Sequence, residues 1–194
     1  GSFYRSTDEM VCISKVTHAI VKEVAPEVSS HYLPHAVDPD FFHLYTTPEE
    51  KARCAEVKNR ILASTNNHFN KNKKIFFWNS RNARRKQSGT LVWWFKEFLD
   101  EVGHDKACLL MHTDTKDVHG QDLEIIISEL GLTNGEVLFS KEKVPPEYLS
   151  FIYNMVDCTI NIADAEGFGL STLESLFTGT PIIVNMTGGL QQQV

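Results

Sequence analysis

Two carboxylates and two glycines stand close together near the end of the chain. The stretch Glu166-Gly167-Phe168-Gly169 is followed by Glu174, with seven residues between the two glutamates. Glycine lets backbone N–H groups approach a bound molecule closely. Apolar residues recur at helical spacing directly after the turn, and the N-terminus of a helix favours a nearby anion. The spacing therefore predicts an anion-binding turn flanked by two carboxylates.

Basic residues are concentrated in another part of the chain. Between residues 71 and 86 there are seven Lys and Arg residues and no acidic residue, although the net charge of the chain is −6. A local basic patch on an acidic protein suits a small anionic ligand better than nucleic acid, which favours a broader positive face. We therefore expect no nucleic-acid partner. The seven residues are Lys71, Lys73, Lys74, Arg81, Arg84, Arg85 and Lys86.

Short apolar runs and helical patterns alternate along the chain and must position these groups. Alternating strands and helices predict a doubly wound parallel sheet of the α/β class. We expect strands at Met10–Ser14, Ile75–Trp78, Ala107–Met111, Val137–Phe139, Cys158–Ile162 and Pro181–Val184. We expect helices at Thr47–Leu62, which Thr47 or Thr46 caps and Pro48 opens, and from Pro145-Pro146 through Met155. Further helices are expected at Thr17–Ala25, Leu91–Val102, Leu123–Leu130 and residues 170–177.

The sheet topology predicts that the chemical groups converge. Ligands of such sheets bind at the carboxyl ends of the strands. Arg81, Lys86 and Glu166 directly follow strands, and Glu174 begins the next helix. That helix is expected to pack by the face that carries Leu170, Leu173, Leu176 and Phe177.

The motif E-G-F-G-L-x-x-x-E, with Gly179-Thr180-Pro181 and Gly188-Gly189 after it, resembles the donor-sugar signature of family-4 retaining glycosyltransferases. Arg81 and Lys86 match the family's loop G-R-x-x-x-x-K-G, with Ser80 and Gln87 in place of the two glycines. The segment around His35-Ala36 resembles the family's P-N-G-V-D turn, with His-Ala in place of Asn-Gly; we expect a different turn here and a structural role for His35. The resemblance extends in order from Ser14 to Leu190.

The resemblance implies a role for each matching residue. Glu166 contacts the donor sugar, and Arg81 and Lys86 hold the diphosphate, where fixed cations lower the barrier to its departure. These three form the expected catalytic group. Glu174 binds the ribose, and the nucleotide base lies at the loop Ser140–Val144, so Val144 is a donor-binding candidate. The turn amides that meet sugar or phosphate oxygens belong to Gly167, Phe168, Gly169 and Leu170.

Two of these assignments have local alternatives. Ser171 and Glu174 have the spacing of a capping box, in which Glu174 would satisfy only the start of its own helix. Arg84 or Arg85 could equally be the cation that binds the diphosphate, and a solvated basic loop is the remaining interpretation.

The implied fold is a Rossmann-like doubly wound sheet that forms one half of a GT-B enzyme. Residues 1–30 are expected to be the end of an N-terminal acceptor domain, and residues 31–194 a donor-binding domain that is incomplete at its C-terminus. The implied function is transfer of a sugar from a UDP-, GDP- or ADP-linked donor to an acceptor. The missing acceptor domain is the expected partner, without which the chain is inactive. A non-catalytic nucleotide-sugar-binding or interaction module with the same fold is the alternative.

Other enzyme classes fit less well. A glycosidase needs two carboxylates about 5–9.5 Å apart, whereas eight residues of helix rise ~12 Å and Glu166 lies ahead of the helix. No G-x-G-x-x-G follows the first strand, which disfavours a nicotinamide enzyme.

Metal, membrane and redox signals are weak. The His and Asp residues of the loop His112–His119 lack the spacing of a structural metal site, and the family implies no catalytic metal; no cofactor is expected. No apolar run is long enough to span a membrane, so membrane association would come only through missing parts. The four cysteines lack a C-x-x-C pattern, which fits a reduced, cytoplasmic setting. The polar loop Ser64–Lys74 is expected to be disordered.

Overall fold

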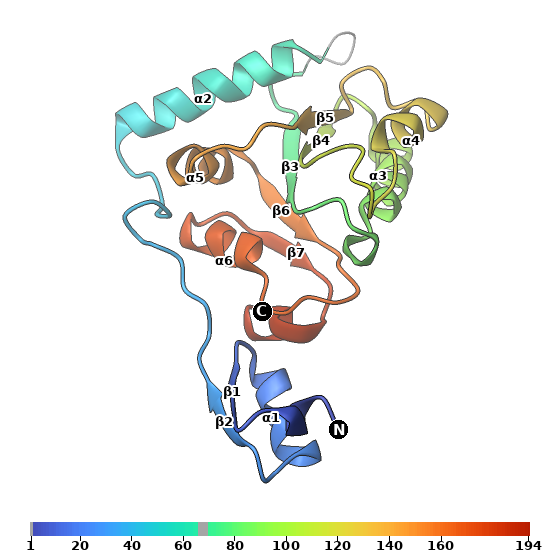
Figure 1. Ribbon diagram of the computed structural model, residues 1–194. Helices are drawn as coiled ribbons and strands as arrows, with labels where there is room; N and C mark the ends of the chain where they lie inside the picture. The colour runs from blue at the N-terminus through green and yellow to red at the C-terminus, as the bar shows by residue number, and fades with distance from the viewer. Residues whose placement is uncertain (1, 66–69) are drawn as a thin grey trace.

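The computed structural model describes residues 2–65 and 70–194, so residues 66–69 of the loop expected to be disordered lie outside the described residues. The larger sheet has five parallel strands in the order β5-β4-β3-β6-β7 (Figure 1). This order confirms the predicted doubly wound sheet. The strands are β3 (Lys74–Asn79), β4 (Ala107–His112), β5 (Val137–Ser140), β6 (Cys158–Asn161) and β7 (Ile182–Val184).

The order of the strands reverses between β3 and β6. From β3 the chain adds β4 and then β5 on one side, and it then returns across the sheet to place β6 on the other side of β3. Ligands of doubly wound sheets bind at this switch point, outside the carboxyl ends of the strands. The residues after β3 and β6 are therefore the ones that the fold brings to a common crevice.

Helices cover both faces of the sheet (Figure 1). One face carries α2 (Pro48–Ala63), α5 (Pro146–Met155) and α6 (Leu170–Phe177), and the other carries α3 (Ser88–Val102) and α4 (Leu123–Glu129). Successive strand residues point to opposite faces. Thus Phe77 of β3 packs in the core beneath α2 and α5, and its neighbour Trp78 packs in the core beneath α3.

The start of α2 is the one that the sequence predicts. Thr47 Oγ1 accepts a hydrogen bond from the Glu50 N–H at 3.2 Å, and the Glu50 carboxylate accepts from the Thr47 N–H at 3.0 Å. Pro48 occupies the first turn, where its missing N–H is not needed. This capping box fixes where the helix begins.

The prediction that α6 packs by its leucine face is wrong. Thr172 and Ser175 are fully buried, whereas Leu170, Leu176 and Phe177 are between 40% and 46% exposed. Ser175 Oγ hydrogen-bonds to Thr159 Oγ1 of β6 at 2.8 Å. Small hydroxyl residues let the helix approach the strand closely, and their hydrogen bonds replace those lost with water. The helix therefore turns polar residues inward and leaves leucines outside.

The N-terminal segment forms a separate, smaller unit. Two parallel strands, β1 (Glu9–Cys12) and β2 (Ser29–Tyr32), flank helix α1 (Lys15–Val24), after a short 3₁₀ turn η1 (Tyr4–Ser6). Because β2 pairs with β1, this unit extends to Tyr32.

The unit packs against the 3₁₀ helix η4 (Gly188–Gln192) near the C-terminus, as Figure 1 shows. The Lys15 N–H donates to Gln192 Oε1 at 2.6 Å, and Gln192 Nε2 donates to the Tyr32 hydroxyl at 2.9 Å. No helix of the described residues is long and apolar enough to cross a membrane.

Candidate functional site

The glycine turn between β6 and α6 presents unpaired N–H groups. Gly169 is the N-cap of α6 and has φ 92°, a left-handed conformation that favours glycine. The N–H groups of residues 167–171 donate to no other group among the described residues. Unpaired N–H groups at a helix start favour an anion, so the geometry of the turn is compatible with an anion site.

The backbone at Gly188-Gly189 packs directly against this turn. A Cβ at Gly188 would lie 1.9 Å from the Glu166 carbonyl oxygen, and a Cβ at Gly189 would lie 2.5 Å from the Gly167 carbonyl oxygen. The Gly189 N–H donates to the Glu166 carbonyl at 2.9 Å. Only residues without a side chain allow this contact, which explains why the second glycine pair accompanies the turn.

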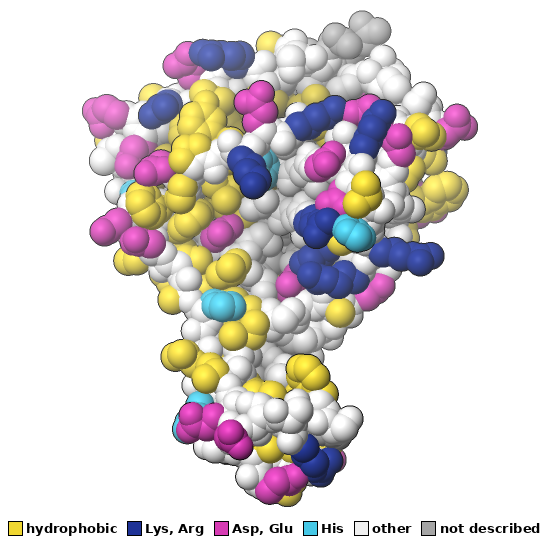
Figure 2. Space-filling view, in the orientation of Figure 1, with side chains coloured by type: hydrophobic (Ala, Val, Ile, Leu, Met, Phe, Trp, Pro, Cys, Tyr) yellow, Lys and Arg dark blue, Asp and Glu magenta, His cyan; other side chains and the backbone are white. Residues whose placement is uncertain are grey.

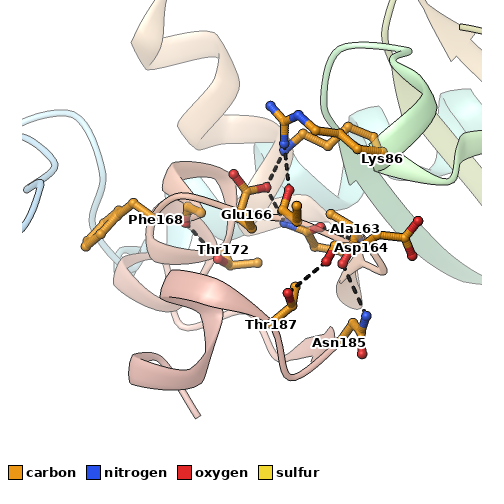
Figure 3. A network of polar contacts seen from close by, with 12 residues as sticks. Lys86, Ala163, Asp164, Glu166, Phe168, Thr172, Asn185 and Thr187 are labelled. Atoms are coloured by element: carbon orange, nitrogen blue, oxygen red, sulfur yellow. Dashed lines mark hydrogen bonds and ion pairs between the residues drawn. The ribbon is translucent and has the colours of Figure 1, made fainter. Parts of the chain in front are cut away.

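An ion pair joins the two halves of the site. Lys86 Nζ donates to Glu166 Oε2, as Figure 3 shows, and the two side chains are 10% and 12% exposed. Asn161 Nδ2 donates to the same carboxylate oxygen at 3.4 Å. Within the described part of the chain, Glu166 Oε1 accepts no hydrogen bond. One oxygen is thus held in place and the other is available to a ligand.

Further polar contacts fix the loop between β6 and Glu166. Thr187 Oγ1 donates to the Asp164 carbonyl at 2.8 Å, and Asn185 Nδ2 donates to the Ala163 carbonyl at 3.2 Å (Figure 3). The loop that carries Glu166 is therefore tied to the segment after β7.

A cavity of about 400 Å³ opens between these groups. Its walls come from the linker after β2, the carboxyl end of β3 and the glycine turn. Figure 2 shows Lys and Arg side chains gathered beside a hollow in the middle of this face. Of the predicted site residues, the cavity brings together Lys86, Glu166, Gly167, Phe168, Gly169 and Leu170.

His35 also lines this cavity, although we expected only a structural role for it. Its ring lies edge-on to Phe168, with ring centroids 5.3 Å apart. Neither His35 nor Ala36 has a positive φ, so the segment does not form the left-handed turn that Asn-Gly would favour. The different turn expected from the sequence is confirmed.

The structure does not bring Arg81 to the cavity. Its guanidinium makes two hydrogen bonds to the Asp117 carboxylate, at 2.6 and 3.1 Å. The guanidinium and the His119 N–H hold the pKa of Asp117 well below its ordinary value, at about 2. Arg85, one of the alternatives, does line the cavity, and its guanidinium donates to the Ala165 carbonyl at 2.7 Å.

The two positions that replace family glycines behave differently. Gln87 follows the 3₁₀ turn η3 (Arg84–Lys86) and keeps a glycine-like left-handed conformation, with φ 57°. Its side chain donates to Asp164 and accepts from Thr90 Oγ1, and these contacts offset the strain. Ser80 has no positive φ, so a side chain is tolerated there.

Glu174 does not act as a helix cap. Because α6 begins at Leu170 with Gly169 as its N-cap, the capping-box alternative is wrong. Glu174 Oε2 instead accepts a hydrogen bond from the Tyr153 hydroxyl at 2.8 Å. Burial raises the pKa of Glu174, and the bond from Tyr153 offsets part of that rise.

Tyr153 is the residue of this site that sequence reasoning missed. Its side chain is fully buried, and Asn79 Nδ2 donates to its hydroxyl at 2.9 Å. Burial, together with the nearby charge of Glu174, raises the pKa of Tyr153 well above its ordinary value. A tyrosine in the middle of an apolar helix gives no sequence signal of this contact, because the contact depends on how α5 and α6 pack.

The remaining candidates lie outside the cavity. Val144 is half-buried in the loop after β5 and is not among the residues that line it. His112 Nδ1 pairs with Ser140 Oγ at 2.9 Å. Within residues 2–65 and 70–194, no group of three or more His, Cys, Asp and Glu side chains is placed to hold a metal ion.

No model of a protein family matches the chain. A 72-residue stretch is 42% identical to D-inositol 3-phosphate glycosyltransferase of Corynebacterium urealyticum; it covers 37% of this chain and 16% of that protein.

Solved structures match over the whole length. Sucrose-phosphate synthase of Thermosynechococcus elongatus is 21% identical with a TM-score of 0.77, and the match covers 100% of this chain and 44% of the enzyme. A glycosyltransferase of Rickettsia africae is 20% identical, with a TM-score of 0.74 over 100% of this chain and 50% of that protein. Anabaena HepE, solved with UDP and glucose, is 14% identical with a TM-score of 0.74, and the match covers 97% of this chain and 47% of HepE. The chain thus has the fold of a GT-B glycosyltransferase domain and spans half or less of each of these proteins.

Proposed function

We propose that this chain supplies the donor-binding half of a family-4 retaining glycosyltransferase, which transfers a sugar from a nucleotide-sugar donor to an acceptor. One observation carries the proposal: at the switch point of the sheet, the Lys86–Glu166 pair and the unpaired N–H groups before α6 share one cavity. The motif E-G-F-G-L-x-x-x-E and the glycosyltransferase relative support the same assignment.

In the proposed complex the diphosphate of the donor lies between Lys86 and the glycine turn. Lys86 Nζ is a compact positive charge, and the N–H groups of residues 167–171 donate to phosphate oxygens. The diphosphate competes with Glu166 for Lys86, which frees Glu166 to accept hydrogen bonds from the sugar. As the bond to the sugar breaks, negative charge grows on the leaving diphosphate, where these fixed groups lower the barrier.

The other assignments follow from position in the fold. Glu174 accepts from the ribose, and the loop that contains Val144 lies at the nucleotide base. Arg85 lines the cavity already, whereas Arg81 reaches the diphosphate only by breaking its hydrogen bonds to Asp117. The Arg81 side chain is 62% exposed, although that of Asp117 is only 12% exposed. Solvent around the guanidinium screens the pair, so a diphosphate is able to replace Asp117. Anabaena HepE was solved with UDP, and we propose UDP as the first nucleotide to test, ahead of GDP and ADP.

Retention of configuration in this proposal needs no protein nucleophile. The acceptor hydroxyl attacks from the face that the diphosphate leaves, and a diphosphate oxygen takes its proton. The acceptor is held by a second domain across the cleft, which is the proposed partner. A reduced, cytoplasmic setting belongs to the proposal, since the four cysteines are buried and unbridged.

A non-catalytic nucleotide-sugar-binding module is the second candidate. It is favoured by one observation, that Arg81 is paired with Asp117 outside the cavity. The test is a calorimetric titration with UDP-, GDP- and ADP-glucose, followed by a turnover assay with an acceptor-binding domain supplied. Binding with turnover supports the transferase, binding without turnover supports the module, and no binding contradicts both.

A further inference from the structure

A chain of hydrogen bonds leads from the cavity wall to Glu174. Asn79, which lines the cavity, donates to the Tyr153 hydroxyl at 2.9 Å, and Tyr153 donates to Glu174 Oε2 at 2.8 Å. A phenol has one proton to donate. Because Asn79 donates to the phenol oxygen, the phenol proton is committed to Glu174.

The packing around Tyr153 gives its hydroxyl a single position. The side chain is fully buried, and its ring lies edge-on to Phe42 and Phe77, with centroids 6.3 and 5.2 Å away. Thr180 Oγ1 also donates to the Tyr153 carbonyl at 2.7 Å. Buried side chains in close-packed cores do not reorient freely. The donor that faces Glu174 is therefore fixed before any ligand arrives.

Glu174 keeps one oxygen available. Within the described residues Oε1 accepts no hydrogen bond, while Oε2 accepts from Tyr153. Leu170 and Ser171 line the cavity, and Glu174 lies one helical turn further along the same face. A carboxylate held through one oxygen cannot rotate without breaking that buried hydrogen bond.

We propose that Tyr153 and Asn79 are positioning residues that orient Glu174 as a fixed acceptor for ribose hydroxyls, and that they thereby set a preference for ribonucleotides over 2′-deoxyribonucleotides. This inference rests on the proposed function. An ionised carboxylate only accepts hydrogen bonds, so both ribose hydroxyls must donate. A nucleotide without the 2′-hydroxyl leaves a partly buried acceptor unpaired, which sites built to bind a hydroxyl reject strongly.

The test compares dissociation constants for UDP and 2′-deoxy-UDP, or the corresponding pair for GDP or ADP if the parent chain binds that nucleotide better. We expect the parent to prefer the ribonucleotide about tenfold or more. Tyr153→Phe keeps the ring and removes the donor, and we expect its preference to fall to about threefold or less, mainly through weaker ribonucleotide binding. Tyr148→Phe, on the exposed part of the same helix, is the matched control and keeps the ratio of the parent.

The ratio of the two affinities distinguishes a positioning role from a purely structural one. If Tyr153 were only structural, Tyr153→Phe would weaken the binding of both nucleotides equally. If Tyr153→Phe fails to fold, Asn79→Ala, which leaves the phenol in place, must lower the same ratio. A folded Tyr153→Phe variant that keeps the parent ratio overturns the inference, as does Asn79→Ala with the parent ratio when Tyr153→Phe fails to fold. A parent that binds both nucleotides equally overturns the inference alone, whereas a parent that binds no nucleoside diphosphate overturns the proposed function with it.

Discussion

Lys86 and Glu166 are far apart in sequence and share one nearly buried ion pair. Removing one partner of a buried pair leaves an uncompensated charge, which costs about 3–5 kcal/mol. A ligand that separates the pair must therefore offer both groups a replacement. A sugar diphosphate does so, because the phosphate is a partner for the ammonium and the sugar hydroxyls are partners for the carboxylate. At the residue scale, binding thus exchanges one internal ion pair for contacts of both groups with the ligand.

Asp117→Asn tests whether Arg81 joins the diphosphate. The amide keeps an acceptor for the His119 N–H and removes the charge that holds Arg81. If Arg81 is a ligand, calorimetry should show nucleoside diphosphate binding tighter by about two- to fivefold, the range typical of ion pairs that solvent screens. The added substitution Arg81→Ala should abolish the gain. Unchanged affinity in both variants would assign the second cation to Arg85.

Glu174→Gln should stabilise the unliganded protein and weaken nucleotide binding. Gln still accepts from Tyr153, but it removes a carboxylate whose burial raises its pKa. Nucleotide affinity should fall by roughly 1–3 kcal/mol, because the charged acceptor is lost. Glu97→Gln, exposed on α3, is the control and should change neither quantity.

The stability effect of Glu174→Gln should depend on pH. A raised pKa means that the folded state binds the proton more tightly than the unfolded state. The free energy of unfolding of the parent therefore falls as pH rises from the ordinary pKa of a glutamate through the raised one. Thermal unfolding should show the advantage of the variant above this interval and not below it. An advantage that is the same at every pH would contradict burial of the charge as the cause.

At the scale of elements, the sequence predicts which strands and helices form better than it predicts which face of a helix packs inward. The apolar runs, with the threonines and Pro48 at the start of α2, predict β3 to β7 and α2 within a residue or two, because local preference and burial agree there. The orientation of α6 is not predictable in this way. Its leucines and its hydroxyl residues both recur at helical spacing, and the close approach to Thr159 decides between them.

Gly188→Ala tests the support beneath the glycine turn. The new Cβ would meet the Glu166 carbonyl oxygen at 1.9 Å, and φ at Gly188 is 48°. Strain and overpacking together should lower the free energy of unfolding by about 2–4 kcal/mol, and nucleotide affinity should fall because Glu166 moves. Gly131→Ala is the control, since φ is 71° and no atom lies within 4 Å. It should lose only about 1–2 kcal/mol and keep its affinity. Equal effects of the two substitutions on affinity would contradict the supporting role.

At the scale of the molecule, the site depends on where the sheet reverses its order. Strand ends that share a switch point bring Lys86 and Glu166 together, and this part of the site was predictable from the order of elements and the motif spacing. The pairing of Arg81 with Asp117, and of Tyr153 with Glu174, was not predictable. Each joins side chains from different elements, and only the packed structure determines their distance.

Diphosphate binding by Lys86 is tested most directly by a titration of the chain with UDP, GDP and ADP beside variants of Lys86. We expect the parent to bind at least one of them and Lys86→Met to bind it at least about tenfold more weakly, since hydrogen bonds to charged groups are the strong ones. The double variant Lys86→Met with Glu166→Gln leaves no unpaired charge and should fold but bind as weakly. Lys51→Met, on the exposed face of α2, should bind like the parent. A parent that binds none of the three, or a folded double variant that binds like the parent, would contradict diphosphate binding at this site.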